Sequence, residues 1–229
     1  MLNKISIVQK LILLLFFLSV QFIYATDLEN PFIKNKGQLP QKVIAKVCLP
    51  GGALFIEKGI FTYHFYNQQK LADIHNHRTT DRSIKAHAFK VIFKNANENI
   101  DSFLEEKSEF FENYYLGNNQ NNWVENVRHY KTLTQKNIYD GIDLKMYRSE
   151  GNLKYDIIVN PNANSKKLKL SYNEIDAIFI KNGNLYVQTS VNTITEQKPF
   201  AYQILDGIKK EIQCNYKLKG KILSFEFPT

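Results

Sequence analysis

Apolar and polar residues alternate with a period of two through most of this chain, and turns containing Gly, Asn or Asp separate the alternating runs. This alternation indicates strands with one buried face. It predicts strands at residues 42–48, 53–57, 60–66, 87–93, 142–147, 154–159, 167–172, 177–180, 185–189, 193–197, 210–218 and 221–227. The turns between them, at 149–152, 181–184, 206–207 and 219–220, suit tight antiparallel hairpins. We therefore expect an all-β fold, either an antiparallel β-sandwich or an open barrel-like meander.

Helical periodicity is scarce. One short helix is expected at about 122–126, with Trp123 and Val127 on one side, and a helical turn near 105–109. The polar stretch 67–85 is predicted to be a mobile loop. Residues 32–116 and 117–227 are expected to form two packed sheets of one domain.

The first 25 residues have the composition of a secretory signal peptide. Lys4 and Lys10 precede an apolar run of about 14 residues, too short for a membrane span of about 20, and Ala25 offers a small cleavage residue. Thr26, where a lipoprotein would have Cys, argues against lipid attachment. We expect a signal peptide at 1–25 and a single β-rich domain at 26–229 without a membrane span. Such a chain would be extracellular or at the cell surface, or periplasmic without a sorting domain.

The net charge of +8 falls to +6 without Lys4 and Lys10. The chain has 26 Lys and only 4 Arg, whereas nucleic-acid recognition favours Arg, so no nucleic-acid partner is expected. The 24 Asn residues indicate a Lys- and Asn-rich composition that explains the charge without a partner. A surface glycan bound by Lys166, Lys167 and Lys169 is the alternative.

Cys48 and Cys214 lie near opposite ends of the mature chain. An exported chain with an even number of cysteines permits a disulfide, and two buried free thiols are the alternative. Closing so long a loop would contribute roughly 4–5 kcal/mol in the chain-entropy model.

Several motifs follow one another in a specific order: FIKNKGQLP at 32–40, FENYYLGNN at 111–119, NWVENV at 122–127, YDGIDL at 139–144 and LKYDIIVNP at 153–161. They resemble an uncharacterised N-terminal domain (DUF7948-like) of large secreted proteins of Bacteroidota. In that family the domain often precedes β-propeller (SBBP) repeats, PKD-like modules and a gliding-motility-associated or type IX secretion C-terminal region. Asp140 stands where the family usually has Pro. The resemblance implies downstream modules as partners and an undefined biochemical role.

Three acidic residues in these motifs, Asp140, Asp143 and Asp156, are the candidates for a hydrolase with paired carboxylates. A structural role in turns and cross-strand pairs is the simpler interpretation. His75 and His77 suggest a metal site only weakly, because they lie in a polar stretch, and no cofactor motif is present.

Three aromatic residues, Trp123, Tyr130 and Tyr147, are the candidates for a carbohydrate-binding platform. Core packing is the commoner use of such residues in a small β domain, and we expect Trp123 to be buried, in which case Trp123→Ala would cost roughly 3–5 kcal/mol. We therefore expect a secreted or cell-surface, non-catalytic β module, with a carbohydrate-binding module and a hydrolase as alternatives. Because relatives continue beyond residues 225–227, we also expect that the chain lacks downstream modules and self-associates through its last hairpin.

Overall fold

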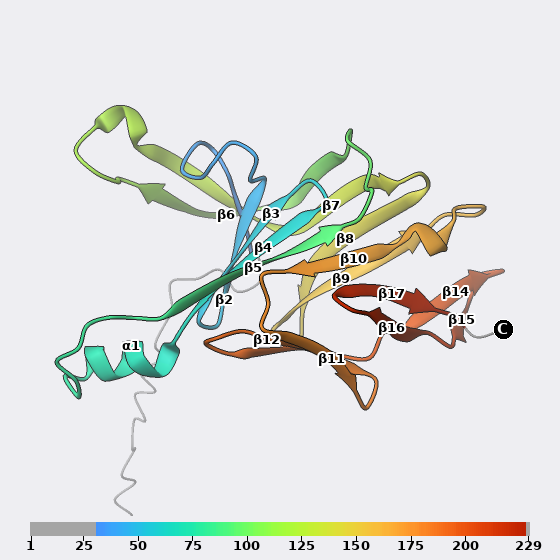
Figure 1. Cartoon of the computed structure of the whole chain (residues 1–229). Helices are drawn as coiled ribbons and strands as arrows, with labels where there is room; N and C mark the ends of the chain where they lie inside the picture. The colour runs from blue at the N-terminus through green and yellow to red at the C-terminus, as the bar shows by residue number, and fades with distance from the viewer. Residues whose placement is uncertain (1–30, 228–229) are drawn as a thin grey trace, which may run out of the picture.

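The computed structural model describes residues 31–227, and strands dominate it (Figure 1). The strands are β1 Phe32–Lys34, β2 Ala45–Leu49, β3 Gly52–Glu57, β4 Ile60–Tyr66, β5 Ala86–Phe93, β6 Asp101–Tyr114, β7 Val124–Tyr139, β8 Ile142–Ser149, β9 Asn152–Val159, β10 Lys169–Asn173, β11 Ala177–Lys181, β12 Asn184–Gln188, β13 Thr193–Glu196, β14 Ala201–Leu205, β15 Ile208–Ile212, β16 Asn215–Lys219 and β17 Ile222–Glu226. The helices are α1 Gln68–His75 and two 3₁₀ turns, Gln120–Asn122 and Ser165–Lys167. The prediction of an all-β, antiparallel fold is confirmed.

Twelve strands form one antiparallel sheet in the order β16-β17-β10-β5-β4-β3-β2-β1-β7-β8-β9, with β6 also paired to β7. Strands β11 to β13 form a second sheet, and β14 and β15 form a separate hairpin. Because the large sheet takes strands from both 32–116 and 117–227, sheet membership does not follow the expected division between those two ranges.

Strand β7 connects the two arms of the large sheet. It pairs with β1 at His129 and Tyr130, and with β8 from Thr132 to Tyr139. Phe32, Leu54 and Leu144 belong to one buried apolar cluster, which therefore packs the β1–β5 arm and the β8–β9 arm together.

The hairpin turns have the backbone that their sequences favour. Both central residues have positive φ in the turns Glu150-Gly151 (53° and 77°), Asn182-Gly183 (53° and 80°) and Asp206-Gly207 (51° and 77°). Such turns match the right-handed twist of antiparallel strands. The sequence therefore predicted these connections correctly.

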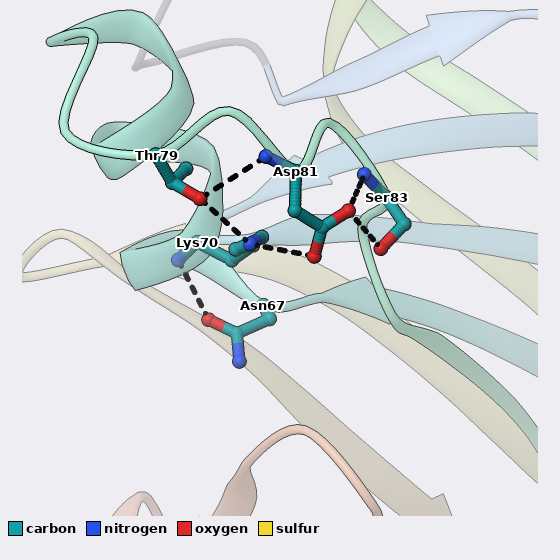
Figure 2. Close-up of polar contacts among 5 residues, drawn as sticks. All are labelled: Asn67, Lys70, Thr79, Asp81 and Ser83. Carbon is teal, nitrogen blue, oxygen red and sulfur yellow. Dashed lines mark hydrogen bonds and ion pairs between the residues drawn. The ribbon is translucent and has the colours of Figure 1, made fainter.

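The predicted loop at 67–85 contains helix α1. Asn67 caps the helix by accepting a hydrogen bond from the Lys70 amide (2.9 Å), and Lys70 Nζ contacts Asp81 Oδ2 (2.8 Å) and Thr79 Oγ1 (3.3 Å), as Figure 2 shows. Asp81 Oδ1 in turn accepts from the amide and hydroxyl of Ser83. These hydrogen bonds hold the pKa of Asp81 well below its usual value, with the bond from Lys70 the largest cause. No residue of α1 is buried, so polar contacts rather than the core order this excursion.

Other local predictions were wrong. The expected helix at 122–126 is a 3₁₀ turn that ends at Asn122, after which β7 begins, and the expected turn at 105–109 lies within β6. The expected strand at 210–218 is two strands, β15 and β16.

Cys48 and Cys214 are both free, so of the two alternatives that the sequence left open the structure has free thiols, with Cys214 buried and Cys48 exposed. Five strands separate β2, which carries Cys48, from β16, which follows Cys214. Six strand spacings of about 4.8 Å amount to roughly 29 Å across the sheet. A disulfide requires Cα atoms within about 7 Å.

Candidate functional site

A groove of about 770 Å³ lies where the β1–β2 connection meets β6 and β7. It is lined by Lys34, Asn35, Gly37, Leu39, Gln41, Val43, Ile44, Ser102, Phe103, Leu104, Glu105 and Tyr130. Polar, charged and aromatic residues are mixed with aliphatic ones along it. This is the composition of a binding groove more than of a packing defect in the core.

Strand register places four of the lining residues on one face of the sheet. Tyr130 pairs with Phe32 of β1, and Lys34 lies two residues further along β1 on the same face. On the other side of β7, Glu105 pairs with Thr132 and Phe103 with Thr134. Because paired residues project to the same face, and alternate residues on a strand do so too, Lys34, Tyr130, Glu105 and Phe103 share one side.

Most of the polar side chains named below line the groove without a partner of their own among the described residues. Within residues 31–227, the Lys34 ammonium, the Gln41 amide and the Tyr130 hydroxyl have no hydrogen-bond or ion-pair partner. Glu105 accepts from Thr134 (3.1 Å) and more weakly from Thr132 (3.5 Å), both through Oε2, so Oε1 remains available. Donors and acceptors are therefore present together in the groove.

Asn35, by contrast, is fully used in building the groove wall. Its Nδ2 group donates to the carbonyls of Leu39 (3.2 Å), Pro40 (2.9 Å) and Val43 (2.8 Å). Its Oδ1 accepts from the amides of Gly37 (2.9 Å) and Leu39 (3.2 Å). The motif at 32–40 thus folds the β1–β2 connection around one side chain and satisfies its backbone.

The three predicted carboxylates lie outside the groove, each with a partner. Asp140, in the β7–β8 turn, contacts Lys167 Nζ (3.2 Å) and Asn97 Nδ2 (3.2 Å), and these hydrogen bonds lower its pKa. Asp143 is only 6% exposed and accepts from Lys136 Nζ and the Asn137 amide, both at 2.8 Å. Asp156 accepts from the Tyr147 hydroxyl (3.1 Å).

Asp143 and Asp156 are the pair whose spacing comes nearest to that of hydrolase carboxylates. Asp143 pairs with Ile158 and Asp156 with Lys145, so the two residues are diagonal neighbours, whose Cα atoms lie about 7–8 Å apart in sheets. Side chains at this backbone spacing can reach the carboxyl separation of inverting glycosidases. However, Asp143 is buried under its Lys136 contact, and neither residue lines the groove. The pair does not present two carboxyl groups to a common cleft.

The three predicted aromatic residues are dispersed. Tyr130 lines the groove, and Tyr147 shares its sheet face through the pairing with Thr132, but lies on β8. Trp123 lies at the end of the projecting β6–β7 hairpin, 37% exposed, where its Nε1 donates to the Gly117 carbonyl (3.1 Å) and its ring contacts Tyr115. The expectation that Trp123 is a buried core residue was wrong.

Sequence reasoning missed a carboxylate surrounded by tyrosines. Glu196 of β13 accepts hydrogen bonds from Tyr172 of β10 (2.8 Å) and Tyr155 of β9 (2.9 Å). Burial raises the pKa of Glu196, against the lowering effect of these two hydrogen bonds, and burial also raises the pKa of both tyrosines. The alternation of each strand placed these residues inward, but nothing local indicated that they meet. The cluster attaches the small sheet to the large one.

Among residues 31–227, no group of three or more His, Cys, Asp or Glu side chains is arranged to hold a metal ion. In the same part of the chain, no helix is long and apolar enough to cross a membrane.

The structure thus defines an antiparallel all-β domain with a mixed polar and aromatic groove beside its longest strand. The family model described as a domain of unknown function (DUF7948) matches residues 32–229, and the chain belongs to that family. No curated protein matches the chain. No solved structure matches it either.

Proposed function

We propose that this chain is a non-catalytic binding module of an exported protein and that it recognises its partner in the groove beside β7. The observation that carries the proposal is a contrast between polar side chains that have hydrogen-bond or ion-pair partners and polar side chains in the groove that have none in the described part of the chain. The predicted carboxylates have structural partners, whereas Lys34, Gln41 and Tyr130 line a groove without partners among the described residues. Uncommitted polar groups gathered in a concave surface are typical of ligand sites.

The proposed setting is a secreted or cell-surface protein of Bacteroidota. The signal-like residues 1–25, which lie outside the described residues, support export. The motif resemblance supports a place ahead of β-propeller repeats, PKD-like modules or a type IX secretion region, which would be its partners within a longer protein.

Of the two alternative functions, carbohydrate binding has a specific observation in its favour. Tyr130 and Phe103, the latter 49% exposed, both line the groove beside hydrogen-bonding groups. Aromatic faces and polar edges together suit sugar rings. A hydrolase using Asp140, Asp143 or Asp156 has no comparable support, because these carboxylates do not line the groove.

Immobilised neutral polysaccharides, acidic polysaccharides and unstructured peptides would test this proposal. We expect at least one class to retain the wild-type protein and the Trp123→Ala variant, whose change lies outside the groove, but not Tyr130→Ala. Assays for reducing ends and peptide cleavage should show no product. Product release, or retention that does not depend on Tyr130, would contradict the proposal.

A further inference from the structure

We propose that the groove binds a neutral, linear oligosaccharide that crosses β7 obliquely, from Lys34 past Glu105 to Phe103. This inference rests on the proposed binding function and specifies its ligand. It is drawn from the length of the groove, its hydrogen-bonding groups and its charge.

The groove is too long for a single sugar. Ile33 pairs with His129, which places Lys34 level with residue 128 of β7, while Phe103 pairs with Thr134. The lining residues therefore extend over residues 128–134 of β7, six steps along the strand or about 20 Å at the usual rise per residue. Tyr130 lies between the two ends. A linear chain can contact all of these groups at once, whereas a monosaccharide cannot.

The groups in the groove match hydroxyls. A sugar hydroxyl both donates and accepts hydrogen bonds. Lys34 and the Gln41 amide supply donors, Glu105 Oε1 and the Gln41 carbonyl oxygen supply acceptors, and the Tyr130 hydroxyl supplies both. The Tyr130 and Phe103 rings supply apolar surface of the kind that packs against sugar rings.

The charges select against a charged polymer. Lys34 and Glu105 lie on opposite sides of β7 and carry opposite charges. A uniformly anionic chain would therefore meet Glu105, and a uniformly cationic chain would meet Lys34. Like charges brought together at a binding site disfavour the wrong ligand. A neutral chain meets neither penalty.

An extended peptide fits the groove less well. Peptides that add to a sheet need free backbone groups in a regular strand edge. The β1–β2 connection has carbonyls and amides bonded to Asn35, and β6 has register shifts after Lys107 and after Glu112. Bulges and charged residues, here Glu105, Glu106 and Lys107, also discourage strand addition.

Isothermal titration calorimetry with defined oligomers would test the inference. The neutral probes are the disaccharides and hexasaccharides of β-1,4-glucan, β-1,4-mannan and β-1,3-glucan. The competing probes are hexagalacturonate, which is anionic, and a soluble, unstructured peptide of Gly, Ser and Thr residues. We expect one neutral hexasaccharide to bind at least about tenfold more tightly than its disaccharide, a difference of about 1.4 kcal/mol.

Variants would place that binding in the groove. Tyr130→Ala should weaken binding of the hexasaccharide about tenfold, while Tyr130→Phe, which keeps the ring, should stay within about threefold. Because Tyr130 is partly buried, the exposed residues Lys34 and Gln41 provide a second pair of variants, Lys34→Ala and Gln41→Ala, which should each weaken binding without changing the thermal midpoint. Trp123→Ala is the control and should bind as the wild type does.

The outcomes separate the two proposals. Tyr130-dependent binding of hexagalacturonate or of the peptide, without binding of a neutral hexasaccharide, would overturn this inference and leave the binding function standing. Equal affinity for disaccharide and hexasaccharide would overturn the linear ligand. Failure of every probe to bind in a Tyr130-dependent way would overturn both proposals.

Discussion

Single residues of the family-like motifs act mainly by tying the backbone to itself. Asn35 holds the β1–β2 connection, Asp143 holds the Asn137 amide, and the buried Tyr139 donates from its hydroxyl to the Lys94 carbonyl (2.9 Å). The sequence indicated that Asp140 and Asp143 serve structure better than catalysis. It did not indicate the partners of Asp140, because Lys167 and Asn97 are far away along the chain.

Asp143→Ala should destabilise the protein by about 1–3 kcal/mol, because it leaves the Asn137 amide without its acceptor in a nearly buried site. Urea unfolding followed by circular dichroism measures this loss. Asp156→Ala on the adjacent strand is the matched control, since Asp156 is exposed and accepts only from Tyr147 in the described structure, and it should cost less than about 0.5 kcal/mol. Equal losses in the two variants would contradict the structural role of Asp143.

Trp123→Ala should cost about 1–2 kcal/mol, and not the 3–5 kcal/mol of a core tryptophan, because its ring is 37% exposed and contacts mainly the hairpin that carries it. Thermal unfolding is a sufficient measurement. A loss above about 3 kcal/mol would mean that the hairpin packs more tightly than its exposure indicates.

At the scale of elements, β1, β6 and β14 were missed, whereas alternation and turn chemistry predicted most of the other strands. They failed where a strand is buried on both faces, as in β7, in which Thr132, Leu133, Thr134 and Gln135 are all buried in succession. Helix α1 was missed for the opposite reason, because it buries no residue and so has no apolar stripe to reveal it. The groove could not be predicted either, since it is formed by β1, β6 and β7 from distant parts of the chain.

The attachment of β13 to β9 and β10 should make stability depend on pH. Burial raises the pKa of Glu196 above 4.5, so the native state holds its proton more tightly than the unfolded chain does. The stabilisation that protonated Glu196 provides is fully present at pH values below the pKa of Glu196 in the unfolded chain. It is lost as the pH rises through the pKa of Glu196 in the folded protein. We therefore expect wild-type stability, measured relative to Glu196→Gln by urea unfolding, to fall between about pH 4 and pH 7. A difference that stays constant over that range would refute this account of the cluster.

For the whole molecule, reduction should have no effect on stability. Cys48 and Cys214 are free and lie far apart across the sheet order. The thermal midpoint of the purified protein should therefore be the same with and without dithiothreitol, and mass spectrometry should find two alkylatable thiols after denaturation. A lower midpoint under reducing conditions would show that the cysteines pair in a way that this fold does not allow.

The strand order of the large sheet also bears on how fast the chain reaches its native state. Phe32 pairs with Tyr130, Val91 with Tyr172 and Leu170 with Leu223, so the sheet is completed only when segments from its beginning, middle and end have met. Sheets dominated by such distant pairings fold in roughly milliseconds to seconds, far more slowly than helical bundles. A nascent chain of this kind stays unfolded long enough to be threaded through a translocation channel, and under the export proposed above it would acquire its groove on the far side.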